Sequence, residues 1–257
     1  MPPSPPIVLC FSGSDPSGGA GIQADLAAIH HLGAHCVSVI TALTIQNTQN
    51  VFNFYPTPAT VILEQANALA IDLPIKAVKI GMIGSLENAT AICEWLTQHS
   101  ELPVILDPVM VAGGGGDLAE QNMTTAIKQL LCPLATIVTP NTIEAYQLAP
   151  LAHNLKECAQ ELLAHGCKNV LIKGSHDNTP EVINLLYNNA GLIQTYTWPR
   201  LPHSYHGSGC TLAASIAALL AQDIPLNDAV QQAQTYTWEC LKRAYQPGKG
   251  QHIPNRY

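Results

Sequence analysis

Charge is scarce in this 257-residue sequence, because Asp, Glu, Lys and Arg together make up only 11% of it. Aromatic residues are also few, at 5%, whereas hydrophobic residues reach 47%. This balance excludes a disordered chain and predicts a globular protein with a large core. We expect a single domain over residues 1–257, since no linker-like stretch divides the chain.

Positive charge is the scarcest kind. The 11 Lys and Arg are outnumbered by 18 Asp and Glu, which gives a net charge of −7. Nucleic acids and anionic membranes both require a basic face, so neither is an expected partner. A small local positive site for a phosphorylated small molecule is compatible with this balance.

Long apolar runs and targeting signals are missing as well. Thr, Ser or Gln interrupts the longest apolar stretches, and residues 1–6 have no basic segment, so neither a membrane span nor a signal peptide is predicted. The eight Cys are scattered and form no C-x-x-C pair. A disulfide framework is therefore not expected. A cytoplasmic location is expected instead.

Several common motifs are absent, namely the P-loop G-x-x-x-x-G-K-[ST], the dinucleotide motif G-x-G-x-x-G and the hydrolase motif G-x-S-x-G. Gly207-x-Gly209 has Leu212 where a third Gly would stand. The His pairs 30/31 and 203/206 lack a Cys or carboxylate at metal-ligand spacing. We predict that these histidines are polar surface or loop residues.

The sequence does contain a regular alternation of short apolar runs and helical segments. This pattern predicts an α/β protein with a mainly parallel central sheet and helices on both faces. An antiparallel pair is expected at 182–187 and 192–198, and residues 44–58 are predicted to form a flap or edge strands. The other strands are expected at 7–11, 36–43, 77–80, 104–106, 136–138 and 169–172, and the helices at 22–32, 60–71, 86–97, 120–131, 155–165, 212–220 and 227–243.

Polar residues or Gly follow five of these strands, where ligands bind in such sheets. They are Gly13, Gly81, Asp107, Asn141 and Lys173. Lys173 ends a buried strand, where a cation is costly unless an anion meets it. Asn141 and Glu144 are three residues apart and share a helix face. They form either a magnesium site or a helix-capping box, and the two interpretations are compatible.

Residues 206–211, His-Gly-Ser-Gly-Cys-Thr, precede an apolar run from Leu212 to Leu220. Backbone amides of a Gly turn at a helix start form an anion site, and the same field lowers the pKa of a Cys in the first turn. The alternative is ordinary loop punctuation followed by a small buried Cys. These six residues alone do not separate the two.

Seven segments resemble the hydroxymethylpyrimidine/phosphomethylpyrimidine kinases of the ribokinase superfamily, in the right order over nearly the whole chain. They are residues 11–25, 42–48, 79–82, 106–110, 139–144, 171–174 and 206–211. The resemblance implies a three-layer, ribokinase-like sandwich and an ATP-dependent kinase of thiamine biosynthesis. Members phosphorylate 4-amino-5-hydroxymethyl-2-methylpyrimidine and then its monophosphate, and ribokinase-like members often form dimers.

The same resemblance implies roles for individual residues. Cys210 stands where sugar kinases of the superfamily carry a catalytic Asp, beside an anion hole at Gly207, Ser208 and Gly209. Asp107 and Glu144 would serve Mg²⁺. The pyrimidine pocket would be lined by Gly13, Asp25, Gln46, Met82 and Val109, and ATP would be bound by Asn141, Lys173 and Thr211. From position alone, Asp25 would instead lie on a solvated helix face.

The chain departs from the family pattern in places, and other functions stay open. Ser208 replaces the commoner Thr, the Gly113–Gly116 stretch is looser than expected, and the different C-terminal stretch leaves the role of Lys249 open. A pyridoxine/pyridoxal kinase is the first alternative, because some of these share the Gly-x-Gly-Cys motif. A non-catalytic pyrimidine-binding sensor is the second.

Overall fold

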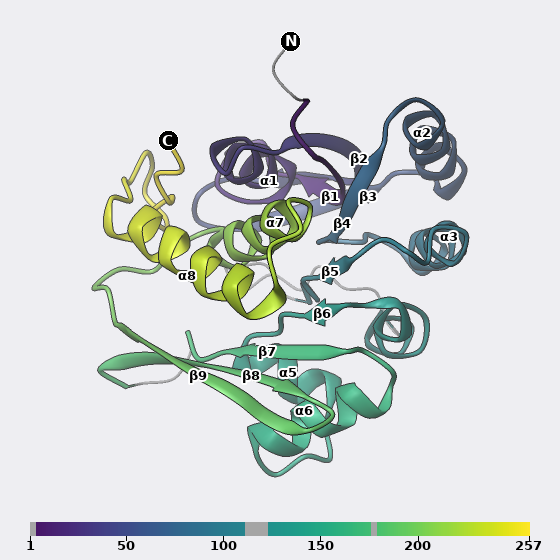
Figure 1. Cartoon of the computed structure of the whole chain (residues 1–257). Helices are drawn as coiled ribbons and strands as arrows, with labels where there is room; N and C mark the ends of the chain where they lie inside the picture. The colour runs from purple at the N-terminus through teal and green to yellow at the C-terminus, as the bar shows by residue number, and fades with distance from the viewer. Residues whose placement is uncertain (1–3, 111–122, 176–178) are drawn as a thin grey trace.

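In the part of the chain that the structure describes, the expected alternation builds one nine-stranded sheet (Figure 1). The structure is a computed structural model that describes residues 4–110, 123–175 and 179–257. The strand order is β3-β2-β1-β4-β5-β6-β7-β8-β9. The strands are β1 (Ile7–Ser14), β2 (His35–Gln46), β3 (Val51–Pro56), β4 (Ile75–Ile80), β5 (Val104–Leu106), β6 (Ile137–Val138), β7 (Asn169–Lys173), β8 (Glu181–Asn188) and β9 (Gly191–Pro199).

The central strands from β2 to β7 run parallel, and the outer strands β3, β8 and β9 pair antiparallel. This confirms the predicted mainly parallel sheet and its antiparallel pair, β8 and β9. The stretch 44–58 supplies the end of β2 and the edge strand β3, as one of the two expectations for it required.

Helices cover both faces of the sheet, as predicted for a three-layer sandwich (Figure 1). One face carries α1 (Gly21–His31), α7 (Ser208–Leu220) and α8 (Leu226–Lys242). The other carries α2 (Ala59–Asp72), α3 (Leu86–Thr97), α4 (Met123–Ala126), α5 (Thr142–Leu148) and α6 (Leu155–Ala164). A π-helical stretch at Ile127–Leu131 and a short 3₁₀ turn at Cys132–Leu134 continue α4. None of the described helices has the length and apolar character needed to cross a membrane.

The two cores follow from the alternation of side chains along each strand. In β1, Leu9 and Phe11 point to the face of α2 and α3, whereas Val8 and Cys10 point to the face of α1 and α7. Helix α7 is buried on every side from Thr211 to Leu219, because α1, α8 and the sheet all pack on it. An apolar run without a polar face is the expected sequence of such a helix.

Two predicted boundaries need comment. Helix α7 begins at Ser208 rather than near Leu212, because Gly207 adopts a left-handed φ of +78° and turns the chain directly into the helix. The predicted helix over 120–131 is described from Met123 onward, as α4 and the π-helical stretch. The Gly113–Gly116 stretch lies outside the described residues.

Backbone hydrogen bonds align the carboxyl ends of the central strands at one edge of the sheet. The amide of Gly81 donates to Phe11, that of Asp107 to Ile80, and that of Thr139 to Leu106. Strand β1 lies between β2 and β4, so the chain crosses over in opposite directions on its two sides. Such a switch point leaves a crevice at the carboxyl ends, where ligands bind in open α/β sheets.

Candidate active site

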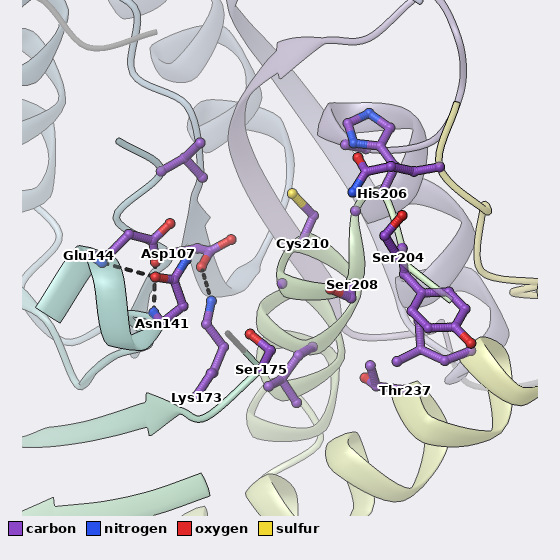
Figure 2. Close-up of a pocket in the computed structure, with 18 of the residues that line it drawn as sticks. Asp107, Asn141, Glu144, Lys173, Ser175, Ser204, His206, Ser208, Cys210 and Thr237 are labelled. Atoms are coloured by element: carbon purple, nitrogen blue, oxygen red, sulfur yellow. Dashed lines mark hydrogen bonds and ion pairs between the residues drawn. The ribbon is translucent and has the colours of Figure 1, made fainter. Parts of the chain in front are cut away.

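A cavity of about 640 Å³ lies at the carboxyl ends of the strands. Its wall combines residues that follow β1, β4, β5, β6 and β7 with the first turn of α7 (Figure 2). In Figure 2, Asp107, Asn141, Glu144 and Lys173 form one group, and Ser208 and Cys210 lie at the start of α7 beside it. The structure therefore brings the polar residues that follow separate strands together, as the sequence predicted.

The first turn of α7 supplies backbone donors to this cavity. Ser208, Gly209 and Cys210 occupy its first three positions, and no side chain among the described residues caps the helix start. Its amides thus have no intrahelical acceptors and lie at the positive end of a 13-residue helix. Gly207 fits here because a Cβ would lie 2.0 Å from the carbonyl oxygen of Gly19, besides requiring a positive φ. This geometry fits an anion hole made of backbone.

Cys210 lines the cavity, but its thiol is not activated in the way the helix start suggests. Burial raises its pKa to about 11, and the carboxylates of Asp107 and Asp25 add to this effect. The ammonium of Lys79 and the backbone amide of Gly21 lower the pKa without overcoming burial. The predicted lowering of the Cys210 pKa is therefore wrong, because it considered the helix dipole and not the desolvation.

Lys173 and Asp107 form a buried ion pair, with Nζ 2.8 Å from Oδ1. The hydroxyl of Thr139 donates to the same carboxylate oxygen at 3.1 Å. The anion that the sequence required for Lys173 is therefore supplied by the protein itself. The ammonium also faces α7, since a Cβ on Gly209 would lie 3.0 Å from Nζ of Lys173.

Glu144 forms the helix-capping box that the sequence allowed for it. Asn141 caps α5 by accepting from the amide of Glu144 at 2.9 Å, and the Glu144 carboxylate accepts from the amide of Asn141 at 2.7 Å. Burial raises the pKa of Glu144 to about 7; Lys173 lowers it and Asp107 raises it further. A carboxylate destabilised in this way, and facing the cavity, is stabilised by a cation.

The described residues contain no group of three or more His, Cys, Asp or Glu arranged to hold a metal. Mg²⁺ does not require one, because it binds through one or two carboxylates together with water and substrate phosphates. Asp107 and Glu144 both line the cavity and both offer oxygen. Their chemistry therefore fits Mg²⁺ bound with a nucleotide.

Of the five residues expected around the pyrimidine, Gly13, Gln46, Met82 and Val109 line the cavity. Asp25 does not line it. Its carboxylate is fully buried on α1, 2.9 Å from Nζ of Lys79, and accepts from the hydroxyl of Ser12 at 2.6 Å. Both expectations for Asp25, a solvated helix face and a pocket wall, therefore differ from the structure, because Lys79 holds the side chain behind the wall.

Thr211, expected at the nucleotide, also lies behind the wall and is fully buried. Its hydroxyl donates to the carbonyl of Gly207 at 2.7 Å and accepts from Nε of Arg256 at 2.9 Å. Thr211 lies one turn into α7, and its side chain points into the protein core rather than into the cavity. Thr211 is therefore not in a position to contact a nucleotide in the cavity.

His206 is the main residue that the sequence interpretation missed. It is buried rather than exposed, and its Nε2 lies 2.9 Å from Oδ2 of Asp15 and 2.7 Å from the side-chain amide of Gln46. Asp15 lies 191 positions away in the sequence, so no local spacing marks this pair. The one available signal was the position of His206 directly before Gly207.

The part of the cavity bounded by β8, β9 and α8 was not predicted either. Its wall includes Val182 of β8, Trp198 of β9, and Trp238 and Leu241 of α8. Gln234 supports this wall by accepting from the indole of Trp198 at 3.1 Å. An apolar region beside an anion hole and an acidic pair matches the needs of a purine nucleotide.

The comparisons with known proteins agree with this geometry. A family model described as phosphomethylpyrimidine kinase matches residues 15–255. A thiamine biosynthesis bifunctional protein of Geobacter sulfurreducens is 39% identical over 95% of this chain, which spans 50% of that longer protein. A hydroxymethylpyrimidine/phosphomethylpyrimidine kinase of Haemophilus influenzae is 37% identical, over 97% of this chain and 96% of its own length.

Solved structures are similar over nearly the whole chain. The pyridoxal kinase from Staphylococcus aureus, determined with pyridoxal and with ADP, superposes with a TM-score of 0.88 at 29% identity. The match covers 99% of this chain and 94% of that enzyme. The sequence and structural matches together extend over the sheet, the cavity and α7. The chain therefore belongs to the phosphomethylpyrimidine kinase family.

Proposed function

We propose that this protein transfers the γ-phosphoryl group of ATP to 4-amino-5-hydroxymethyl-2-methylpyrimidine, and then to its monophosphate, in thiamine biosynthesis. One observation carries the proposal. The uncapped start of α7 opens into the cavity that Gln46, Met82, Glu144 and Trp238 also line. A phosphoryl group passing from a nucleotide to an alcohol would cross this point, where backbone amides stabilise its charge.

The protein's task in such a transfer is positioning and neutralisation of charge, because the transition state is loose. Gln46 and Val109 would orient the ring, and Lys173 and Asn141 would hold the phosphates of ATP. Asp107 and Glu144 would hold Mg²⁺, which would neutralise phosphate charge. Cys210 would take the proton of the hydroxyl. Its raised pKa makes the thiolate scarce but strongly basic, so the transfer should accelerate with pH.

A pyridoxine/pyridoxal kinase is the second candidate, favoured by the likeness to the S. aureus enzyme. The sequence relatives favour the pyrimidine, since the H. influenzae kinase matches at higher identity over nearly its whole length. A non-catalytic sensor is disfavoured because Cys210, Glu144 and Lys173 all lie together at the cavity. The proposal also includes a single domain. It places the protein in the cytoplasm, which the eight free Cys support. It further includes a homodimer, which light scattering would test.

A panel of acceptors tests the function. Hydroxymethylpyrimidine, its monophosphate and pyridoxal are each supplied with Mg-ATP, and kcat/KM is measured for each. The proposal requires the two pyrimidines to exceed pyridoxal. A preference for pyridoxal would reassign the enzyme, and ATP consumption with none of the three would leave the family fold without this activity.

A further inference from the structure

Arg256 lies behind the anion hole, near the end of the chain, and its side chain is 3% exposed. Its Nη2 donates to the carbonyl of Gly19 at 2.6 Å, and its Nε donates to the hydroxyl of Thr211 at 2.9 Å. Nη2 also lies 3.4 Å from the carbonyl of Gly207. One guanidinium thus links the glycine loop that precedes α1 to the turn that opens α7.

The two segments that Arg256 links lie unusually close together. A Cβ on Gly207 would lie 2.0 Å from the Gly19 carbonyl oxygen and 2.9 Å from Nη2 of Arg256. A Cβ on Gly19 would lie 2.4 Å from the ring of His206. Because these two backbone segments are so close, a change in the group that joins the carbonyls of Gly19 and Gly207 would shift the first amides of α7.

Arg256 is also unusual in its charge. Among the described residues, no carboxylate lies within ion-pair distance of it, whereas the buried ammonium groups of Lys79 and Lys173 each have one. Its partners are two carbonyls and a hydroxyl. A buried cation without an anion is costly, and the positive end of α7 beside it adds to that cost. An anion that binds at the α7 start relieves it.

The segment that carries Arg256 is fixed on α8. The hydroxyl of Tyr236 donates to the carbonyl of Arg256 at 2.9 Å, and the amide of Asn255 donates to the carbonyl of Cys240 at 3.0 Å. These contacts hold the backbone of residues 255–256 on α8 independently of the glycine loop. Arg256 is therefore anchored on α8 and hydrogen-bonded to both the Gly19 loop and the Gly207 turn.

We propose that Arg256 is a positioning residue for phosphoryl transfer, which joins the Gly19 loop to the Gly207 turn and adds positive charge behind the anion hole without contacting substrate. The role in transfer rests on the proposed function. The effect on anion binding does not, because ADP binding measures it without an acceptor.

The test compares Arg256→Met and Arg256→Lys with Arg243→Met, which removes the same charge from an exposed residue at the end of α8. We expect Arg256→Met to weaken ADP in calorimetry and to lower kcat roughly ten- to a hundredfold, with the KM of the pyrimidine unchanged within error. Arg256→Lys should recover ADP affinity but not kcat, because it keeps the charge and loses the fork. Arg243→Met should match the wild type in both.

The outcomes separate this proposal from its alternatives. A lower melting temperature with wild-type kcat and ADP affinity in Arg256→Met would overturn it. If that variant does not fold, Arg256→Lys decides, since an unchanged kcat there contradicts the positioning role and a lowered kcat with ADP affinity retained supports it. If the wild type phosphorylates no pyrimidine but Arg256→Met still weakens ADP binding, the proposed function is refuted and the effect of Arg256 on anion binding is retained.

Discussion

Nζ of Lys173 lies 2.8 Å from Oδ1 of Asp107, so the cation that ends β7 is compensated by the carboxylate that follows β5. Glu144 belongs to the same charged group, because Lys173 lowers its pKa and Asp107 raises it. Under the proposed function, a nucleotide phosphate would therefore share Lys173 with Asp107. Substitution of Lys173 or Asp107 should therefore change the titration of Glu144.

Lys173→Met should move the pH profile of the enzyme. Without the ammonium, burial and Asp107 raise the pKa of Glu144 further above about 7, so the acid limb of kcat/KM for Mg-ATP should move to higher pH. Turnover measured from pH 5 to 9 gives the shift. The double variant Lys173→Met/Asp107→Asn removes the repulsion and should return the limb toward its original position, and an acid limb that stays in place in the single variant contradicts the coupling.

Glu144→Gln should raise the Mg²⁺ requirement without lowering stability at pH 8. The pKa of Glu144 is about 7 in the folded protein and 4.5 ordinarily, so the native state binds its proton more tightly. Its ionisation therefore lowers the free energy of unfolding as pH rises from 4.5 to about 7. Above that range Gln avoids this cost and still accepts from the amide of Asn141. Mg²⁺ titrations and melting curves at pH 5 and 8 measure both effects.

A matched control for this variant is Glu157→Gln, which alters the corresponding helix-capping position of α6 away from the cavity. It should leave the Mg²⁺ titration unchanged. If Glu144→Gln also leaves the Mg²⁺ titration unchanged and its melting temperature falls at pH 8, Glu144 serves only as a helix cap.

The fold was largely predictable because its signals are local. The helix at 86–97 and the strand at 104–106 agree with the structure at both ends, since apolar periodicity and flanking polar residues define them. The start of α7 was placed too late, because Leu212 marks the first apolar residue and not the turn at Gly207. A glycine with positive φ leaves no periodic signal.

The site was predictable where residues follow strands or open α7. Parallel strands place Gly13, Asp107, Asn141 and Lys173 at one edge whatever the details of packing. The partners of these residues were not predictable, since the ion pair of Lys79 with Asp25 and the contact of His206 with Asp15 join distant parts of the chain. The predicted direction of the Cys210 pKa shift was wrong for a related reason, because desolvation depends on the whole surrounding structure.

Gln46→Leu should leave the fold intact and remove most of the selectivity for the pyrimidine. An amide both donates and accepts, as an aminopyrimidine edge requires, and deletion of a buried polar partner costs about 1–3 kcal/mol. The ratio of kcat/KM for the pyrimidine to that for pyridoxal measures the effect. An unchanged affinity for the pyrimidine would show that Gln46 does not contact the ring.

His206 should act through Gln46. Burial raises the pKa of the Asp15 carboxyl, but hydrogen bonds from His206, Ser17 and Ala20 outweigh burial and hold this pKa below its usual value. The ionised carboxylate only accepts, so Nε2 of His206 carries the proton of their hydrogen bond. The same Nε2 lies 2.7 Å from the side-chain nitrogen of Gln46, so the imidazole fixes the position of the Gln46 amide at the cavity wall. His206→Leu should raise the KM of the pyrimidine in the wild type and not in Gln46→Leu, and equal effects in both backgrounds would contradict the coupling.

Lys79→Met should destabilise the fold strongly, by about 3–5 kcal/mol, because it leaves the fully buried Asp25 carboxylate without its cation. The double variant Lys79→Met/Asp25→Leu removes both charges and should recover most of that loss. Urea unfolding of the three proteins measures the difference. A single variant as stable as the wild type would mean that the pair is not needed for folding.

Cys210→Ser should lower turnover by roughly 10²–10⁴, the range for loss of a general base, because a hydroxyl ionises far above neutral pH. Burial raises the pKa of the Cys210 thiol to about 11, so wild-type kcat should increase with pH above neutrality as the thiolate forms, and the Ser variant should lack this increase. Cys210→Asp should restore part of the activity, and Cys93→Ser, at a partly buried thiol outside the cavity, should change nothing. Iodoacetamide should label Cys210 faster as pH rises, and bound pyrimidine should protect it. Near-normal turnover of Cys210→Ser with an unchanged pH profile would refute the base assignment and leave the anion hole intact, because its donors are backbone amides that no side-chain substitution removes.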